Sequence, residues 1–177
     1  MEFKLASYQD YERIAALHSK NWKQFCSGIL SDEYLNSDIN GERLAIWQTR
    51  LTNPPFNQRV ILAEEGGLLC GFICAFGKHD YQKGTIIDAL HVDPAYRGRG
   101  LGRQLIQQLM IWVEQYFPDS GIYLEVLREN QQAIRFYTKI GGVCESDRVR
   151  LAPCGTEVEE QTYIWPTTKQ LSNGISS

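Results

Sequence analysis

The sequence of 177 residues predicts a single α/β domain, with a mixed, mainly antiparallel sheet of about seven strands and about four flanking helices. Three observations predict this class. The composition is that of a globular protein, with 43% hydrophobic and 22% charged residues. A chain of this length forms one domain and buries most of its apolar surface. Short apolar or β-branched runs alternate along it with segments of helical spacing, which indicates interleaved strands and helices.

The first half of the chain predicts two helices and three strands. In order, these are a short strand over 3–6, a helix after Ser7, a helix from Ser31 to Asn53, and strands over 59–65 and 68–77. Ser7 is a capping residue with an acid three positions later, which is a variant of the capping box. Gly66-Gly67 is typical of a hairpin turn between the two strands.

The second half predicts four strands and two helices. In order, these are a buried strand over 85–92, a helix from the following loop to Phe117, a strand over 121–127, a helix over 130–139, and closing strands over 143–151 and 157–165. We expect residues 1–166 to form the domain. Residues 167–177 are polar and small, so we expect them to be a flexible tail.

The most informative stretch joins the buried strand over 85–92 to the next helix. Asp93-Pro94 ends the strand, and Arg97-Gly98-Arg99-Gly100-Leu101-Gly102-Arg103 follows. Glycines let an anion approach the free N–H groups of a helix start, and the arginines add positive charge. The stretch therefore predicts a pyrophosphate site. A Walker A loop would need Lys and Ser or Thr after its last glycine, and a dinucleotide fingerprint would need glycine at Arg103.

The spacing of Arg97, Gly100 and Gly102 instead resembles the acetyl-CoA-binding motif of the GNAT N-acetyltransferase superfamily. The resemblance implies a parallel pair of strands, over 85–92 and 121–127, that splays apart at the cofactor site. Acetyl-CoA is the expected co-substrate, with no metal. The residues expected to bind it are Leu90, His91, Val92, Arg97, Gly98, Arg99, Gly100, Leu101, Gly102, Arg103 and Asn130.

A second stretch, from Leu124 to Tyr137, resembles GNAT members that acetylate protein N-termini, such as those of ribosomal proteins. The resemblance implies that Glu125 accepts a proton, Asn130 contacts the cofactor and Tyr137 protonates the leaving thiolate. Each has a structural alternative. Glu125 would be a solvated strand residue, Asn130 an N-cap, and Tyr137 a packed aromatic.

The chemistry of acetyl transfer supports these roles independently. An alkylamine with a pKa of about 10.4 must lose a proton before it attacks, and a carboxylate can take that proton. Asp88 on the central strand is a rival to Glu125 as base, and His91 is a weaker third candidate. A bulge near Leu90–Val92 would free a backbone N–H to stabilise the oxyanion. The expected activity is direct acetyl transfer to a primary amine. The alternative is a non-catalytic domain that binds acyl-CoA.

Charge and cysteine content restrict the partners and the compartment. The net charge of −3 argues against a nucleic-acid partner, and no apolar run approaches the roughly 20 residues of a membrane span. Five cysteines without a CxxC pair, and an opening without an apolar signal region, favour a reducing cytoplasm. The expected partner is an amine, such as a peptide N-terminus, a lysine or a small amine. A homodimer is one option.

Overall fold

The computed structural model describes all 177 residues, Met1–Ser177, as one seven-stranded sheet with five α-helices. The strands are β1 (Glu2–Leu5), β2 (Gln58–Glu65), β3 (Leu68–Asp80), β4 (Gly84–Val92), β5 (Ile122–Leu127), β6 (Val143–Leu151) and β7 (Glu157–Trp165). The helices are α1 (Tyr11–Phe25), α2 (Ile39–Thr52), α3 (Leu101–Tyr116), α4 (Gln131–Lys139) and α5 (Thr168–Ser176). The predicted fold class is confirmed.

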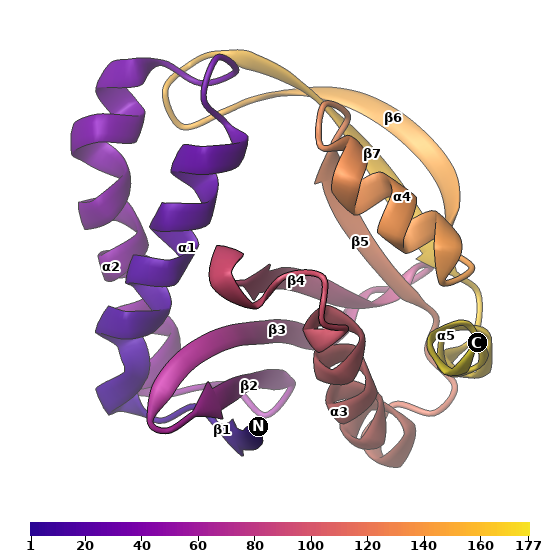
Figure 1. The fold of residues 1–177 in the computed structure, drawn as a ribbon. Coiled ribbons are helices and arrows are strands. Elements are labelled where there is room, and N and C mark those ends of the chain that lie inside the picture. Colours follow the sequence, from indigo (N-terminus) through magenta and orange to yellow (C-terminus); the bar gives the residue numbers. More distant parts are fainter.

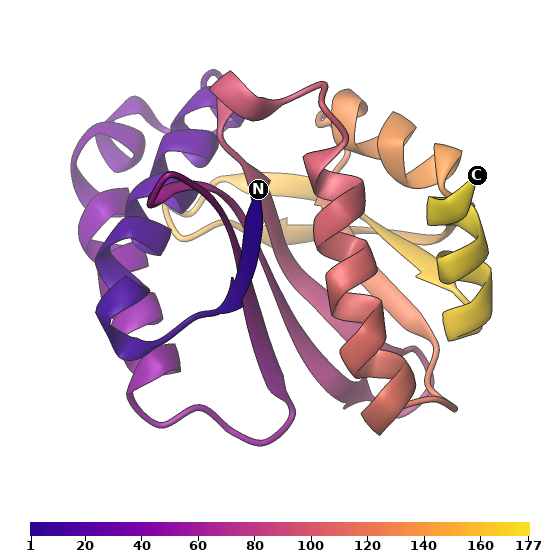
Figure 2. The same cartoon turned by 60° about the horizontal axis from the view of Figure 1, so that its bottom comes forward.

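Helices cover both faces of the sheet, and each face has its own core. Helices α1 and α2 pack on one face, against β2–β4. Trp47 of α2 and Phe72 of β3 are fully buried in this core. Helices α3 and α5 pack on the other face, and α4 adds Phe136 and Tyr137 to that core. Figure 1 shows α1 and α2 on one side and α4 on the other, and Figure 2 shows α3 crossing the sheet.

The sheet order is β1-β2-β3-β4-β5-β7-β6, and every neighbouring pair is antiparallel except β4 and β5. The parallel pair is joined only at Thr85–Ile122 and Ile86–Tyr123. Beyond Ile86 the two strands separate, so that the sheet opens in its middle. The splayed pair implied by the sequence resemblance is confirmed.

The C-terminal residues differ from the expected flexible tail. They form α5, which begins with a capping box between Thr167 and Gln170. Leu171 and Ile175, one helical turn apart, are buried against α3 and β7. Their spacing is the sequence signal for this helix, and the polar composition of the segment concealed it.

A bulge in β3 changes the expected placement of a cysteine. Strict alternation would put Cys70 on the same face as Phe72 and Cys74. The pairing of β2 with β3 shifts register at Ala63–Glu64, which leaves Cys70 without a partner. Cys70 therefore packs toward α3, while Phe72 and Cys74 pack toward α1 and α2. Cys70 and Cys74 are both fully buried.

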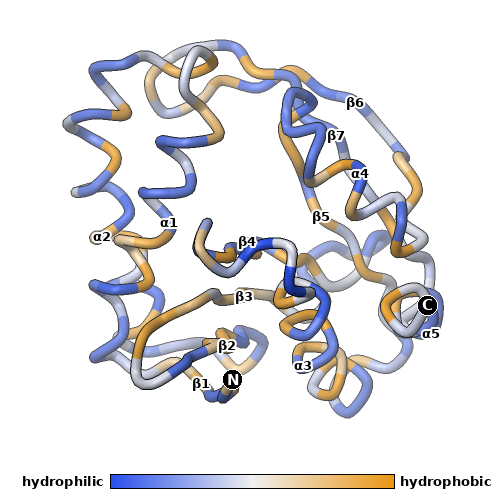
Figure 3. The backbone as a smooth tube through the Cα atoms, viewed as in Figure 1, coloured by the Kyte–Doolittle hydropathy of each residue, from blue (hydrophilic) through white to orange (hydrophobic).

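The hydropathy of the helices agrees with their packing on the two faces of the sheet. Along α2 and α4 the tube alternates between hydrophilic and hydrophobic colours, as helices with one packed face do (Figure 3). No helix in the structure combines the length and the apolar character needed to cross a membrane.

Candidate functional site

The loop between β4 and α3 presents a row of free backbone donors. Gly98 and Gly100 adopt left-handed conformations, with φ of +75° and +77°, and a short 3₁₀ turn over Pro94–Tyr96 precedes them. The six consecutive N–H groups of residues 98–103 have no hydrogen-bond partner. Together with the positive end of the α3 dipole, they form a site suited to a phosphate-type anion.

Two of the three loop arginines are held by other parts of the protein. The Arg97 guanidinium donates to Asn21 Oδ1 and Gln24 Oε1, both at 2.9 Å, and lies 4.7 Å from the centre of the Phe25 ring. Arg103 donates to the Ile175 carbonyl of α5 at 3.0 Å. These side chains fix the loop to α1 and α5 rather than projecting freely toward an anion. Their positive charge remains beside the loop.

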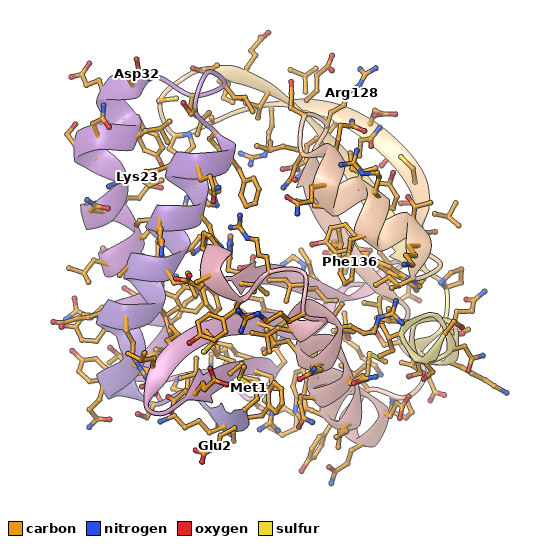
Figure 4. All side chains as sticks on the ribbon, viewed as in Figure 1. Met1, Glu2, Lys23, Asp32, Arg128 and Phe136 are labelled. Carbon is orange, nitrogen blue, oxygen red and sulfur yellow. The ribbon has the colours of Figure 1, made fainter.

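The opening between β4 and β5 is a cleft of about 750 Å³. Its walls come from α1 and α2 on one side and from β5 and α4 on the other. Side chains from these elements, Phe136 of α4 among them, fill the rim of the opening (Figure 4). The structure brings together all the predicted site residues except one. Those that line the cleft are Asp88, Leu90, His91, Val92, Arg97, Gly98, Gly100, Leu101, Gly102, Arg103, Glu125, Asn130 and Tyr137.

The exception is Arg99. Its guanidinium lies 5.4 Å from the centre of the Tyr96 ring, and its side chain does not line the cleft. The sequence pattern did not contain this information.

The central strand has a bulge, at Asp88 rather than at the expected Leu90–Val92. Cys74 pairs with Ala89 and Ala75 with Ile87, so Asp88 has no partner on β3. Its carboxylate lies 2.7 Å from Arg50 Nη1 of α2. Because β5 has diverged at this level, the outer edge of β4 is free and its N–H groups face the cleft.

Tyr137 presents a hydroxyl group that makes no hydrogen bond within the protein. Its ring packs near Phe136, Tyr163 and Trp165. Burial raises the pKa of Tyr137 to about 12, so the hydroxyl is protonated at neutral pH. Asn130 caps α4, with its side chain accepting from Ala133 N–H at 3.2 Å. Asn130 is therefore the N-cap of α4, and it also lines the rim of the same cleft.

Glu125 belongs to a charged cluster that the sequence did not reveal. Arg148 Nη2 lies 2.7 Å from both Glu125 Oε2 and Glu160 Oε1, and Arg150 Nε lies 2.6 Å from Glu160 Oε2. Burial and the charge of Glu160 raise the pKa of Glu125, against the opposing effect of Arg148. For Glu160, burial acts to raise the pKa, but the two arginines hold it below its usual value. In the sequence, the burial of Glu160 was indicated by its spacing of two residues from Val158 and from Thr162. Side chains with this spacing share one face of a strand, and Val158 and Thr162 are both buried.

His91 is a poor candidate for the base. Burial, with the nearby charges of Arg43 and Arg97, lowers its pKa to about 3. Asn21 Nδ2 donates to His91 Nδ1 at 3.2 Å, which fixes the neutral ring. Its neighbour His18 is buried and accepts from Trp47 Nε1 at 3.0 Å, so His18 is a packed residue.

A mixed sheet that opens between two parallel strands, with a glycine-rich anion site at the start of the following helix, defines a class of cofactor-dependent α/β fold. The model of the acetyltransferase (GNAT) family matches residues 17–142. The chain belongs to this family.

The chain matches only part of the length of the curated relatives. N-alpha-acetyltransferase RimI of Mycobacterium tuberculosis is 32% identical over 102 residues, which cover 55% of this chain and 58% of RimI. The uncharacterized protein ML0378 of Mycobacterium leprae is 43% identical over 68 residues, or 38% of this chain and 16% of that protein. The matches thus span less than two thirds of either relative.

Solved structures share the fold across nearly the whole chain. A GCN5-related N-acetyltransferase from Rhodopseudomonas palustris superposes with a TM-score of 0.72 at 21% identity, covering 92% of this chain and 93% of that one. The structure of yncA from Salmonella typhimurium, solved with its cofactor acetyl-CoA, has a TM-score of 0.66 at 19% identity, covering 93% and 92%.

Proposed function

We propose that this protein transfers an acetyl group from acetyl-CoA directly to a primary amine. The observation that carries this function is the opening between β4 and β5, which has an anion site at one end and the free Tyr137 hydroxyl in its wall. The amine belongs to a peptide, as an N-terminus or a lysine, or to a small molecule. The relationship to RimI, which is named as an N-alpha-acetyltransferase, supports the amine-transfer chemistry.

The residues present fit acetyl-CoA. The six free N–H groups of residues 98–103 would bind the pyrophosphate, with Arg97 and Arg103 supplying nearby positive charge. The free edge of β4, from Leu90 to Val92, would hydrogen-bond the extended pantetheine arm as a missing strand would. Asn130, at the rim of the cleft, would contact the same arm from the opposite wall. The acetyl-CoA in the yncA structure supports this cofactor.

In the reaction, the amine nitrogen forms a bond to the thioester carbonyl carbon and the carbon–sulfur bond breaks. Glu125 takes the proton that the amine loses, because its raised pKa makes it a better acceptor than an ordinary carboxylate. Free N–H groups on the edge of β4 stabilise the oxyanion. Tyr137 donates its proton to the departing thiolate. No covalent intermediate on the protein is required.

Asp88 is the second candidate for the base. It lines the cleft and lies on the bulge of β4, next to the expected thioester. Its carboxylate is already engaged by Arg50 at 2.7 Å. We therefore assign proton acceptance to Glu125 and a positioning role to Asp88. We also propose that the protein acts in the cytoplasm, as expected from the sequence. A homodimer stays one option.

The test is release of free CoA thiol from acetyl-CoA with a panel of primary amines. Amine-dependent release, together with the acetylated amine in the mass spectrum, is the expected result. Tight binding of acetyl-CoA without release in any mixture would favour the non-catalytic acyl-CoA-binding domain. Failure to bind acetyl-CoA would show that the anion site over residues 98–103 has been misassigned.

A further inference from the structure

The α2 wall of the cleft contains an arginine that the proposed chemistry does not use. Arg43 lines the cleft, and its side chain is only 11% exposed. Its guanidinium lies 4.2 Å from the centre of the Trp22 ring of α1, which holds the group flat against that helix. A buried arginine in this position needs a partner for its charge and for its donors.

The protein itself supplies only part of what Arg43 requires. Of the five N–H donors of the guanidinium, one makes a hydrogen bond, from Nη2 to Glu42 Oε1 at 3.1 Å. That oxygen also accepts from the Tyr34 hydroxyl at 2.8 Å. The Nε of Arg43 is buried and has no partner. Because this Nε is shielded from solvent, an acceptor from outside the chain would bind the remaining Nη donors of the guanidinium.

Among the cleft arginines that are paired with a carboxylate, Arg43 has the longest ion pair, with Nη2 3.1 Å from Glu42 Oε1. Arg50 faces Asp88 and Arg150 faces Glu160, each across a short ion pair within the cleft. The charge of Arg43 reaches the edge of β4, because it contributes to lowering the pKa of His91. The phosphate-type site precedes α3, and α2 lies with α1 across the opening from β5 and α4 (Figure 1).

We propose that the acceptor amine also carries a carboxylate, and that the guanidinium of Arg43 binds this carboxylate while the amine lies at the free edge of β4. A guanidinium and a carboxylate form paired, charge-assisted hydrogen bonds, which would satisfy the free donors of Arg43. A polyamine, which has only positive charge, would meet repulsion on this wall. This inference rests on the proposed acetyl transfer and names the class of acceptor.

The first test compares amines that differ only in the carboxylate, with the wild-type protein. The pairs are L-lysine and cadaverine, L-ornithine and putrescine, and 2,4-diaminobutyrate and 1,3-diaminopropane. A peptide pair, Ala-Glu-amide and Ala-Gln-amide, separates a free amino acid from an acidic peptide as the source of the carboxylate. We expect the carboxylate-bearing member of at least one pair to have about a tenfold or greater advantage in kcat/KM. Calorimetric titration of the CoA-bound protein with each amine should show tighter binding of the carboxylate-bearing member, without turnover.

The second test removes the charge of Arg43. Arg43→Gln should raise KM for the preferred carboxylate-bearing amine by about 10- to 100-fold, the usual effect of losing hydrogen bonds to a charged group, and change kcat little. KM for its carboxylate-free partner should not rise, because Arg43 gives that amine no attractive contact. Arg43→Lys retains the charge but not the paired geometry, so it should recover part of the loss.

Arg59 provides a matched control. Like Arg43, it stacks over a tryptophan, at 5.1 Å from the centre of the Trp112 ring, and its Nε is buried without a partner. Unlike Arg43, it does not line the cleft. Arg59→Gln should leave the ratio of kcat/KM within each pair unchanged.

Two results would overturn this role for Arg43. One is equal binding and turnover of both members in every pair by the wild-type protein. The other is an Arg43→Gln variant that loses activity equally toward both members. Equal acetylation of both members in every pair would refute the carboxylate contact but leave acetyl transfer intact. Absence of thiol release with every amine would instead count against the transferase function, and the calorimetric preference would still decide the role of Arg43.

Discussion

Arg50 Nη1 of α2 lies 2.7 Å from Asp88 Oδ2, at the bulge of the central strand. This contact ties one candidate base to a guanidinium from the opposite wall, 38 positions away in sequence. Glu125 also contacts an arginine, but burial and Glu160 still raise its pKa. The two carboxylates of the cleft are therefore chemically distinct.

Substitution of each carboxylate tests which one accepts the proton. Glu125→Gln should lower kcat/KM by about 100-fold, and Asp88→Asn by less than about tenfold. A base works only when deprotonated, so wild-type kcat/KM should fall as the pH drops through a pKa above 4.5, the ordinary value for glutamate. This acid limb should disappear in Glu125→Gln. The opposite ranking of the two variants would assign the base to Asp88.

Removal of the Tyr137 hydroxyl tests the proton donor. Tyr137→Phe should lower kcat by about 100-fold or more, with little change in the dissociation constant of acetyl-CoA. The hydroxyl makes no hydrogen bond, so the midpoint of urea unfolding should not fall. Since the pKa of Tyr137 is about 12, its ionisation should cause no loss of wild-type activity below about pH 11.

Tyr123→Phe is the control for this measurement. Burial also raises the pKa of Tyr123 to about 12, but its hydroxyl contacts His79 and its side chain does not line the cleft. Its kcat should match the wild type. Equal losses in both variants would indicate a structural effect of either hydroxyl and not proton donation by Tyr137.

The glycine-rich loop predicts a selective effect on cofactor binding. Gly100→Ala places a side chain at φ +77° and a methyl group on the anion site. We expect a loss of roughly 1–2 kcal/mol in stability and about tenfold weaker binding of acetyl-CoA by calorimetry. Gly67→Ala, at φ +82° in the β2–β3 turn, should show the strain alone. Unchanged binding in Gly100→Ala would contradict the phosphate site.

Two helical glycines should respond in opposite directions. A Cβ on Gly174 of α5 would overlap the carbonyl oxygen of Ile140, so Gly174→Ala should destabilise the protein by about 1–3 kcal/mol. A Cβ on Gly41 of α2 meets nothing within 4 Å, so Gly41→Ala should stabilise it by roughly 0.5–1 kcal/mol. Urea unfolding measures both. A harmless Gly174→Ala would mean that α5 does not pack against Ile140 in solution.

The half-buried His91 predicts loss of stability in acid. Its folded-state pKa of about 3 lies below the ordinary value of 6.5. Above pH 6.5 both folded and unfolded states hold the neutral ring, and the stability is fully present. Between about pH 6.5 and 3 only the unfolded state gains the proton, so stability should fall by about 1.4 kcal/mol per pH unit. Urea unfolding of the wild type and His91→Gln across this range should differ in slope by one proton. Parallel curves would show that His91 takes up the proton in the folded state.

The local chemistry of the site was readable in the sequence. The strand, the glycines and the helix that follow one another from Thr85 to Val113 define an anion site by themselves, because free N–H groups and left-handed glycines are properties of neighbouring residues. Glu125, Asn130 and Tyr137 were indicated by the resemblance of residues 124–137 to GNAT members. All three line the cleft, and their roles stay predictions.

Only the tertiary structure decided which charges are free and which are engaged. Arg97 contacts Asn21 from 76 positions away and Arg148 bridges Glu125 and Glu160, so neither guanidinium is free. Docking of α5 likewise depends on a surface made by α3 and β7. The sequence by itself determined the family motif, the glycine-rich loop with its free N–H groups and the order of the elements. Packing decided which side chains are free to bind a ligand, because burial and ion pairing depend on residues that are distant along the chain.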